Sequence, residues 1–310
     1  MSKALVQQFV AREGLSQYLL DGRVLAMLAA AGFSMKAIFV KLSYAAYPVD
    51  PITLLALRMV LALPLFLLLA WRERGAGPLG RQDIWLLLLI GFLGYYLSSL
   101  TDFIGLFYIS AGLERLILFT YPTLVLLFGA VLLKQPIPAK AWPPMLVCYI
   151  GIFAAVGHDL QQRADGHTVL IGAAWVFASA VSYALYYLGV GKLAKRIGST
   201  RMAGWAGAAS SGMVLAHFAA VGDFTVLPKL PGIIWGYSAA MAVFSTVLPI
   251  ALLAAAIRRL GAGVAAGYAT LGPVLTIVFA WLLLGESFTW MQALGLGLVM
   301  GGVSWLARSK

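Results

Sequence analysis

Residues 108–133 read YISAGLERLILFTYPTLVLLFGAVLL, and residues 261–286 read GAGVAAGYATLGPVLTIVFAWLLLGE. At an offset of 151 residues, 110–133 align with 261–284 without a gap, and both stretches carry a proline inside an apolar run, Pro122 and Pro273. The other matches are Ala111 with Ala262, Gly112 with Gly263, Leu124 with Leu275, Phe128 with Phe279, Leu132 with Leu283, Leu133 with Leu284 and, further along, Gly151 with Gly302. This ungapped register predicts an internal repeat.

Apolar runs of membrane-spanning length fill the rest of the chain. Of 310 residues, 62% are apolar and 11% are charged, which leaves too few charged residues to cover a soluble domain. A helix needs about 20 apolar residues to cross a hydrocarbon core. We therefore predict an all-α integral membrane protein with ten transmembrane helices. The predicted spans are 23–44, 51–71, 83–108, 111–133, 140–157, 169–190, 202–220, 232–257, 261–284 and 289–307.

The repeat and the number of spans together predict the domain organisation. Five spans per half is an odd number, so the second half would enter the membrane upside down. Inverted repeats are common in secondary transporters, which bind substrate near the membrane midplane between the halves. We expect a cytosolic segment at 1–22, a first five-helix repeat at 23–157, a periplasmic linker at 158–168 and a second five-helix repeat at 169–310.

Basic residues lie mainly in alternate connections between the spans. With the N-terminus inside, sixteen Lys and Arg residues fall on the cytoplasmic side, and only Arg115, Arg163 and Lys229 fall on the opposite side. This asymmetry predicts that both termini are cytoplasmic. The formal charge of +11 then reflects topology and does not indicate a nucleic-acid partner. The single cysteine, Cys148, lies in an apolar run, so no disulfide framework is possible.

The two quoted stretches resemble the drug/metabolite transporter superfamily, in the branch built from two EamA domains. In each half of that family a small residue precedes a proline, an apolar run and an acid. The resemblance covers residues 23–307, and within the superfamily the chain is most similar to exporters of amino acids, including the aromatic amino-acid exporter group. Many members close the fourth span with Glu, whereas here Gln135 stands there and Glu286 keeps the acid of the ninth. The resemblance implies a multi-pass protein of the bacterial inner membrane.

Ionisable side chains inside the predicted spans are candidate site residues. Each costs about 2.5–3.5 kcal/mol on insertion scales, so each needs a partner or a function. Lys36 and Lys41 lie in the first span, Arg58 in the second and Asp102 in the third. We predict a buried ion pair between Arg58 and Asp102. The remaining positive charge, with Lys36 deepest, would suit a solute that carries a carboxylate.

Hydroxyl and aromatic side chains at mid-membrane positions can line a cavity at a smaller desolvation cost. The third and eighth spans carry such residues at roughly equivalent positions of the repeat, and the sixth and ninth carry tyrosines. Tyrosines at helical spacing also pack between helices without binding a ligand, and both interpretations stay open. The predicted substrate-binding residues are Lys36, Tyr95, Ser99, Asp102, Tyr183, Ser245 and Tyr268.

Prolines and glycines inside the spans predict bends and close contacts. Pro122, Pro249 and Pro273 each lack a backbone N–H and would bend a helix, so we predict hinges that serve gating. Static kinks are the other interpretation. The sequence Gly297-x-x-x-Gly301 predicts close helix approach, within the chain or between two copies.

These features predict a secondary transporter that exports amino acids and related small metabolites by alternating access. No Walker motif is present, so ATP is not the direct driver, and we expect no cofactor. The alternative is proton-coupled efflux of drug-like cations, with Asp102 as the candidate carboxylate. A membrane enzyme would need clustered acids or histidines, and a channel would need a filter motif. We expect no enzyme activity and no metal site; the expected partners are a small-molecule substrate and membrane lipid, and a monomer suffices.

Overall fold

The computed structural model describes residues 21–72, 77–162, 166–287 and 289–308, and throughout these ranges its secondary structure is helical. Most of the predicted cytosolic segment at 1–22 lies outside the described residues. Eight helices are long and apolar enough to cross a membrane, so the chain is a multi-pass membrane protein. They span Gly22–Ala46, Pro51–Arg72, Arg81–Tyr108, Ala111–Leu133, Ala139–Leu160, Gly166–Gly191, Gly232–Leu260 and Trp290–Arg308. In lipid, such helices satisfy their own backbone hydrogen bonds.

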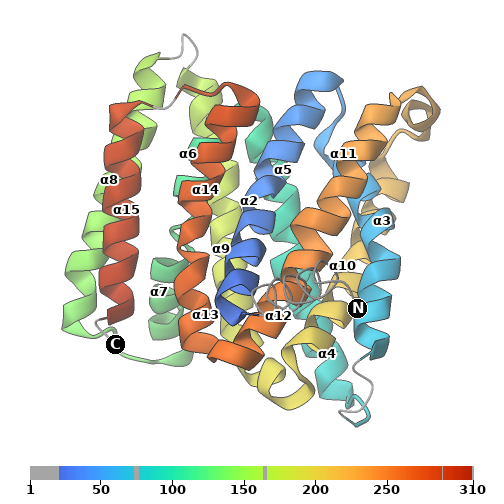
Figure 1. Ribbon diagram of the computed structural model, residues 1–310, viewed down its shortest axis with the longest axis horizontal. Coiled ribbons are helices and arrows are strands. Elements are labelled where there is room, and N and C mark those ends of the chain that lie inside the picture. Colours follow the sequence, from blue (N-terminus) through green and yellow to red (C-terminus); the bar gives the residue numbers. More distant parts are fainter. Residues whose placement is uncertain (1–20, 73–76, 163–165, 288, 309–310) are drawn as a thin grey trace, which may run out of the picture.

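The helices follow the predicted order in both halves (Figure 1). The first half contains α2 (Gly22–Ala46), α3 (Pro51–Arg72), α4 (Arg81–Ile90), the π-helical turn η1 (Gly91–Leu97), α5 (Ser98–Tyr108), α6 (Ala111–Leu118), α7 (Tyr121–Leu133), the short η2 (Ala139–Ala141) and α8 (Trp142–Gln162). The second half contains α9 (Gly166–Ile197), α10 (Ser199–Val221), η3 (Phe224–Lys229), α11 (Gly232–Ala242), the π-helical η4 (Val243–Val247), α12 (Leu248–Leu260), α13 (Ala262–Ala269), α14 (Leu271–Phe279), the π-helical η5 (Ala280–Leu284) and α15 (Trp290–Arg308).

Most helix ends agree closely with the predicted spans, with two exceptions. The helix α8 continues to Gln162 and α9 begins at Gly166, so helix occupies much of the predicted linker at 158–168. The helix α9 also runs to Ile197, beyond the predicted end at 190. Two of the ten predicted spans are not among these eight helices. The span 202–220 corresponds to α10, which is rich in Ala, Gly and Ser. In the span 261–284, the apolar helix 271–284 is shorter than the eight.

The internal repeat is visible in the secondary structure. The helices α6 and α13 begin at Ala111 and Ala262, and they end at Leu118 and Ala269, so the offset is 151 at both ends. Each is followed by a break and then by a second helix, α7 in the first half and α14 in the second. The sequence repeat is therefore also a structural repeat, down to the residue at which each helix stops.

The repeat extends to the backbone conformation at the ends of these segments. Lys134 has φ 53° and Gly285 has φ 65°, so the left-handed residue that ends each segment lies at the same repeat position. The next residue closes an equivalent hydrogen bond in each half. The N–H of Gln135 donates to the carbonyl of Gly129, and the N–H of Glu286 donates to that of Ala280, both at 3.2 Å.

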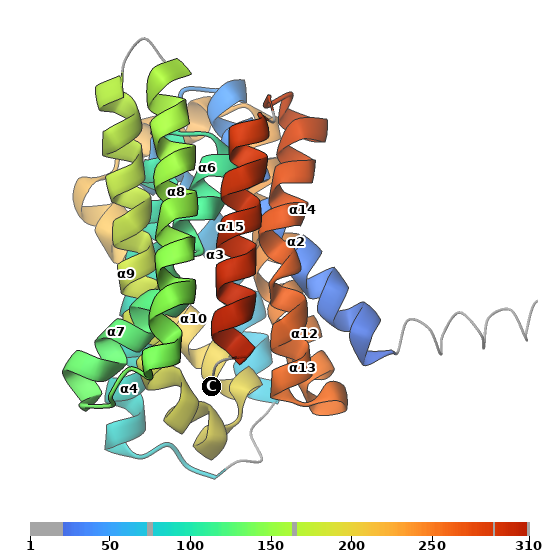
Figure 2. The ribbon, with the colours of Figure 1, turned by 90° about the vertical axis from the view of Figure 1, so that its left-hand side faces the viewer.

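The last helices of the two halves, α8 and α15, pack side by side (Figures 1 and 2). A Cβ on Gly151 would lie 2.8 Å from the carbonyl oxygen of Gly295, and a Cβ on Gly302 would lie 2.7 Å from that of Pro144. These two contacts are equivalent under the repeat, and the pairing of early with late residues makes the helices antiparallel. Glycine is required because backbone approaches backbone. In contrast, a Cβ on Gly297 or Gly301 would meet nothing within 4 Å.

The second helices of the halves, α3 and α10, also pack together, and each reaches the other half's π-helical turn. The Tyr96 hydroxyl of η1 lies 3.0 Å from Nδ1 of His217 on α10. The Arg58 Nε on α3 donates to the Thr246 hydroxyl of η4 at 3.0 Å. Polar contacts of this kind and dense packing hold helices together in lipid, where apolar burial alone gives little drive.

Of the three predicted hinge prolines, Pro122 and Pro273 lie near the start of helices that follow a break, whereas Pro249 lies within the continuous helix Gly232–Leu260. Pro122 is in the first turn of α7, Pro249 in the first turn of α12, and Pro273 is the third residue of α14. A first-turn proline after a break removes no hydrogen bond that the helix would otherwise make. Breaks at Phe119–Thr120 and at Thr270 accompany Pro122 and Pro273, and Pro249 follows the π-helical turn η4 in an unbroken helix.

Candidate functional site

The helices α2, α5 and α6 bring four charged side chains together inside the bundle. The connection from α5 to α6 is short, because α5 ends at Tyr108 and α6 begins at Ala111. Asp102 lies in the middle of α5 and Glu114 in the first turn of α6, and the short connection lets both carboxylates reach Lys36. Lys36, in the middle of α2, faces both of them.

The four side chains form a chain of ion pairs. The Lys36 Nζ lies 2.7 Å from Oδ2 of Asp102 and 4.0 Å from Oε1 of Glu114. The Arg115 Nε lies 3.6 Å from the other Glu114 oxygen, Oε2. The side chains of Asp102 and Glu114 are 1% and 0% exposed, and those of Lys36 and Arg115 are 17% and 11% exposed. We call these four residues the charge cluster; its formal charges balance.

The charge cluster leaves hydrogen-bonding capacity unused. Beyond the ion pairs, the carboxylate oxygens of Asp102 and Glu114 accept no hydrogen bond from any described residue. Arg115 likewise donates none from Nε or Nη2 within the described chain. Buried polar atoms normally find partners, and leaving them without partners is costly. Donors and acceptors of both signs therefore lie together at this point without a full set of hydrogen-bond partners among the described residues.

The structure changes the predicted ion pairing of Arg58. Among the described residues, Asp102 pairs with Lys36 rather than with Arg58. The Arg58 guanidinium lies 5.5 Å above the Phe103 ring and bonds to Thr246. Successive residues of a helix point about 100° apart, so Phe103 faces α3 while its neighbour Asp102 faces α2. Lys41, the other lysine of α2, donates to the carbonyls of Leu106 and Ile109 where α5 ends.

The predicted excess of positive charge is also absent from the cluster. The sequence analysis placed Arg115 on the side opposite the termini and did not single out Glu114, whereas the structure half-buries Arg115 and fully buries Glu114. The first turn of α6 packs against α2 and α5, which turns the Glu114 side chain inward. Both residues fall within the predicted span 111–133. The rule that marks ionisable residues inside spans as functional candidates could have found them.

Five tyrosines form a continuous aromatic group beside the charge cluster. Tyr183 and Tyr186 of α9 stack at a centroid distance of 5.4 Å, and Tyr121 of α7 stacks on Tyr187 at 5.1 Å. Tyr95 of η1 joins edge-on to Tyr186 at 5.7 Å. We call these five residues the tyrosine cluster. It brings together two predicted site residues, Tyr95 and Tyr183, from different halves of the chain.

The remaining predicted site residues are placed differently. Ser99 is half-buried one turn before Asp102, while its neighbour Ser98 forms the inter-helix bond, at 3.1 Å to Ser179. Ser245 is 2% exposed in η4, and its hydroxyl has no partner among the described residues. Tyr268 packs with an apolar group that includes Leu25 and Ala26 near the start of α2, about three turns from Lys36.

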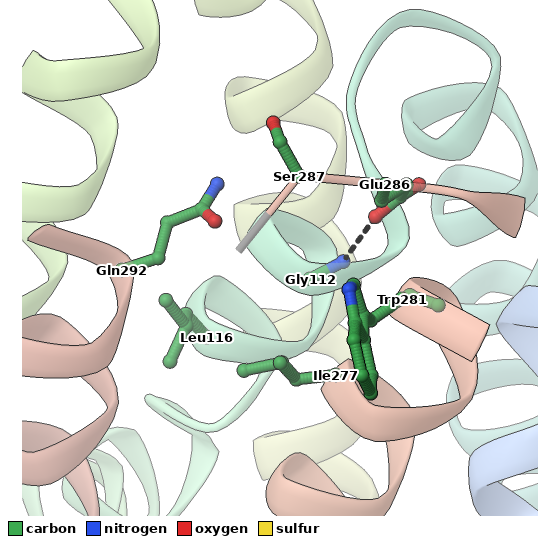
Figure 3. A pocket seen from close by; sticks show the side chains of 8 residues that line it. Gly112, Leu116, Ile277, Trp281, Glu286, Ser287 and Gln292 are labelled. Carbon is green, nitrogen blue, oxygen red and sulfur yellow. Dashed lines mark hydrogen bonds between the residues drawn. The ribbon is translucent and has the colours of Figure 1, made fainter. Parts of the chain in front are cut away.

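Two pockets lie outside these clusters. The first is shown in Figure 3 and is lined by Gly112, Leu116, Ile277, Ala280, Trp281, Glu286, Ser287 and Gln292. The second is lined by Pro48, Val49, Asp50, Pro51, Ile104, Phe107 and Tyr108. Neither lining includes a predicted substrate-binding residue. We call the first the Glu286 pocket, after the carboxylate that borders it.

Comparisons with known proteins place these features in context. The model of the EamA-like transporter family matches residues 21–157 and 170–308. The chain is 31% identical over 281 residues to the uncharacterized transporter YcbK of Bacillus subtilis (strain 168), covering 89% of each chain. The uncharacterized transporter YetK of the same organism is 24% identical over 248 residues, covering 79% of this chain and 74% of YetK. A protein crystal structure superposes with a TM-score of 0.62 at 18% identity, covering 93% of this chain and 98% of the other, which shows a shared fold.

Proposed function

This chain belongs to the EamA-like transporter family, and from that premise we propose that it is a secondary transporter that exports amino acids and related small metabolites. The observation that carries the proposal is the charge cluster, which holds two half-buried cations and two buried anions between α2, α5 and α6. An α-amino acid carries an ammonium and a carboxylate on one carbon, so it needs acceptors and donors within a single site.

Exchange of ion pairs gives such a solute a way into the membrane interior. The substrate ammonium would face Asp102 and Glu114, and the substrate carboxylate would face Lys36 and Arg115. Because each new ion pair replaces an internal one, the site gains no net charge when it fills. A net buried charge would be costly, and a balanced exchange avoids that cost.

The tyrosine cluster supports a preference for amino acids with apolar or aromatic side chains. Tyr95 lies seven residues before Asp102 in the same span, which corresponds to a rise of about 10 Å. That separation suits a substrate whose charged end is held at the charge cluster and whose side chain extends toward the aromatic rings. Aromatic pairs prefer edge-on or offset geometry, which the existing Tyr95–Tyr186 contact already adopts.

The pathway follows from the repeat. We infer ten membrane crossings in two inverted five-helix repeats, 23–157 and 169–310, joined through 158–168, with both termini cytoplasmic in a bacterial inner membrane. Sixteen basic residues on one side support that orientation. If the halves exchange conformations, a site between them opens first to one side and then to the other. We propose that half a helix swings at the breaks beside Pro122 and Pro273 and at the π-helical turn before Pro249.

Proton-coupled efflux of cations is a second candidate, and one observation favours it. Two buried carboxylates, Asp102 and Glu114, share Lys36, and a cation could displace that lysine. Substitution of Lys36→Glu separates the two candidates, since it should weaken amino-acid transport and strengthen cation transport.

Counterflow in proteoliposomes tests the proposal directly. Vesicles preloaded with unlabelled phenylalanine, threonine or alanine are diluted into labelled amino acid, and accumulation is followed. We expect counterflow for the unmodified chain and its loss in Glu114→Gln and Lys36→Met. The exposed Lys229→Met variant, which changes a lysine far from the cluster, should retain it. Transport of a drug cation with no amino-acid counterflow would overturn the proposal.

A further inference from the structure

Glu286 joins the two halves at one end of the bundle. Its Oε1 accepts from the backbone N–H of Ala111 at 2.9 Å, and its Oε2 accepts from that of Gly112 at 3.3 Å. These are the first amides of α6, in the first half, whereas Glu286 follows η5 in the second half. Figure 3 shows the carboxylate directed at Gly112 beside the Glu286 pocket.

The contact is of a strong kind. The first amides of a helix have no partner within the helix, and the helix dipole favours negative charge there. Hydrogen bonds from backbone N–H groups to a carboxylate are roughly twice as strong as those to a neutral acceptor. Because the bond joins the halves directly and α6 packs on α14 beside it, this end of the molecule is held closed.

The repeat supplies a counterpart at the other end. Gln135 lies 151 residues before Glu286, follows the equivalent left-handed residue, and closes the same backbone hydrogen bond. The helix start that corresponds to Ala111 is Ala262, where α13 begins. The two residues differ in one respect here: Gln135 is exposed, whereas Glu286 is half-buried against the opposite half.

We propose that Glu286 and Gln135 are the two latches of the conformational cycle. Glu286 holds its end closed on α6, and Gln135 closes the opposite end on the start of α13 when the halves exchange conformations. One latch is charged and the other is neutral, so the closed Glu286 end is the more stable state. This inference rests on the alternating access of the proposed function and adds the residues that set its resting direction.

Two equivalent reporter positions make the test quantitative. Ala280 lines the Glu286 pocket and is 2% exposed, and its repeat equivalent, Gly129, is buried near Gln135. A Cβ on Gly129 would meet only the Gln135 side chain, at 3.8 Å, so a cysteine fits. The chain has one native cysteine, Cys148, which is fully buried. The unmodified protein therefore serves to measure the background reaction of the thiol reagent with Cys148. Reaction rates of Ala280→Cys and Gly129→Cys with a small thiol reagent are measured in lipid nanodiscs, where both ends meet the reagent.

The expected rates follow from the unequal latches. Glu286→Gln keeps the shape of the side chain and removes its charge. Introduced into the Ala280→Cys protein, it should raise the rate of reaction with the thiol reagent about fivefold. Gln135→Glu, at an exposed position where folding is safe, should lower the rate at position 129 and raise it at position 280. The double exchange should invert the ratio of the two rates. Asp50→Asn is the matched control, because Asp50 caps α3 within the first half and, among the described residues, makes no hydrogen bond or ion pair with the second half.

The result that overturns the latch is equally definite. Unchanged rates at both positions in Glu286→Gln and in Gln135→Glu would show that neither residue biases the conformation, as would equal shifts in Asp50→Asn. The assay contains no substrate. A chain that exports a different solute would still show the rate changes, so failure of the proposed substrate and failure of the latch give separate results.

Discussion

Cys148 and Val299 occupy equivalent positions in the two repeats, and they touch: the Cys148 thiol lies 3.6 Å from the Val299 carbonyl oxygen. A residue that contacts its own equivalent lies close to the axis that relates the two halves. That axis therefore passes between α8 and α15 and, because the equivalent helices α3 and α10 also pack together, continues across the bundle. The charge cluster belongs to the first half alone, on α2, α5 and α6.

Packing along this axis predicts a sharp difference between neighbouring glycines. Gly295→Ala places a methyl group 2.8 Å from the Gly151 carbonyl oxygen, so the helices must separate. We expect a loss of about 1–3 kcal/mol in the free energy of unfolding. Gly297→Ala, two residues away and free of contacts within 4 Å, is the control. Thermal unfolding in detergent compares the two variants; equal melting temperatures would contradict the close contact.

The ion pair of Lys36 and Asp102 predicts a stability that depends on both partners. Lys36→Met leaves the buried Asp102 carboxylate without its ion-pair partner. We expect the free energy of unfolding to fall by about 3–5 kcal/mol. The double variant Lys36→Met with Asp102→Asn removes both charges, so most of that stability should return, while amino-acid counterflow stays absent. Recovery of transport along with stability would show that the pair serves only to hold the helices together.

The tyrosine cluster predicts selectivity among substrates. Tyr183→Leu removes a ring that stacks on Tyr186 and contacts Tyr121 edge-on at 5.2 Å. We expect the KM for phenylalanine or tryptophan to rise about tenfold, since stacked pairs contribute about 0.5–1.5 kcal/mol beyond burial. The KM for alanine should change little. The control is Tyr237→Leu, whose ring pairs with Phe39 in another part of the bundle. A uniform rise for all amino acids would indicate a packing role.

The left-handed residues at the repeat ends predict opposite responses to substitution. Lys134 is the one non-glycine residue with positive φ in the described chain. Lys134→Gly should raise the free energy of unfolding by about 0.5–1 kcal/mol, and Gly285→Ala should lower it by a similar or larger amount. Unfolding in a denaturing detergent series measures both. A stabilising Gly285→Ala would show that this backbone conformation is not retained in solution.

Much of the fold could be predicted from the sequence because lipid permits few alternatives. The spans that begin at Pro51 and Ala111 start at the predicted residues, since long apolar runs and turn signals leave little freedom. The repeat was readable because the offset of 151 holds without a gap from Ala111 to Gly151.

Side-chain partners were less predictable, because they depend on the rotation of each helix about its own axis. Asp102 and Phe103 are neighbours in sequence, yet one faces Lys36 and the other lies under Arg58. The burial of Glu114 depends on the direction in which the first turn of α6 faces, which apolar periodicity does not specify. Pro122 predicted an irregularity in its helix, but the sequence did not distinguish a bend from a break.

The π-helical turns give the molecule a dependence on residue count. A π-helical turn holds one more residue than an α-helical turn, so η1 rotates everything after it by about 100° relative to an unbroken α-helix. Asp102 meets Lys36 because of that phase shift, and η4 offsets the equivalent span of the second half in the same way. Removal of a single residue from η1 would leave an apolar helix of adequate length but would turn the Asp102 carboxylate away from Lys36. The number of residues in η1 therefore determines the direction in which Asp102 points.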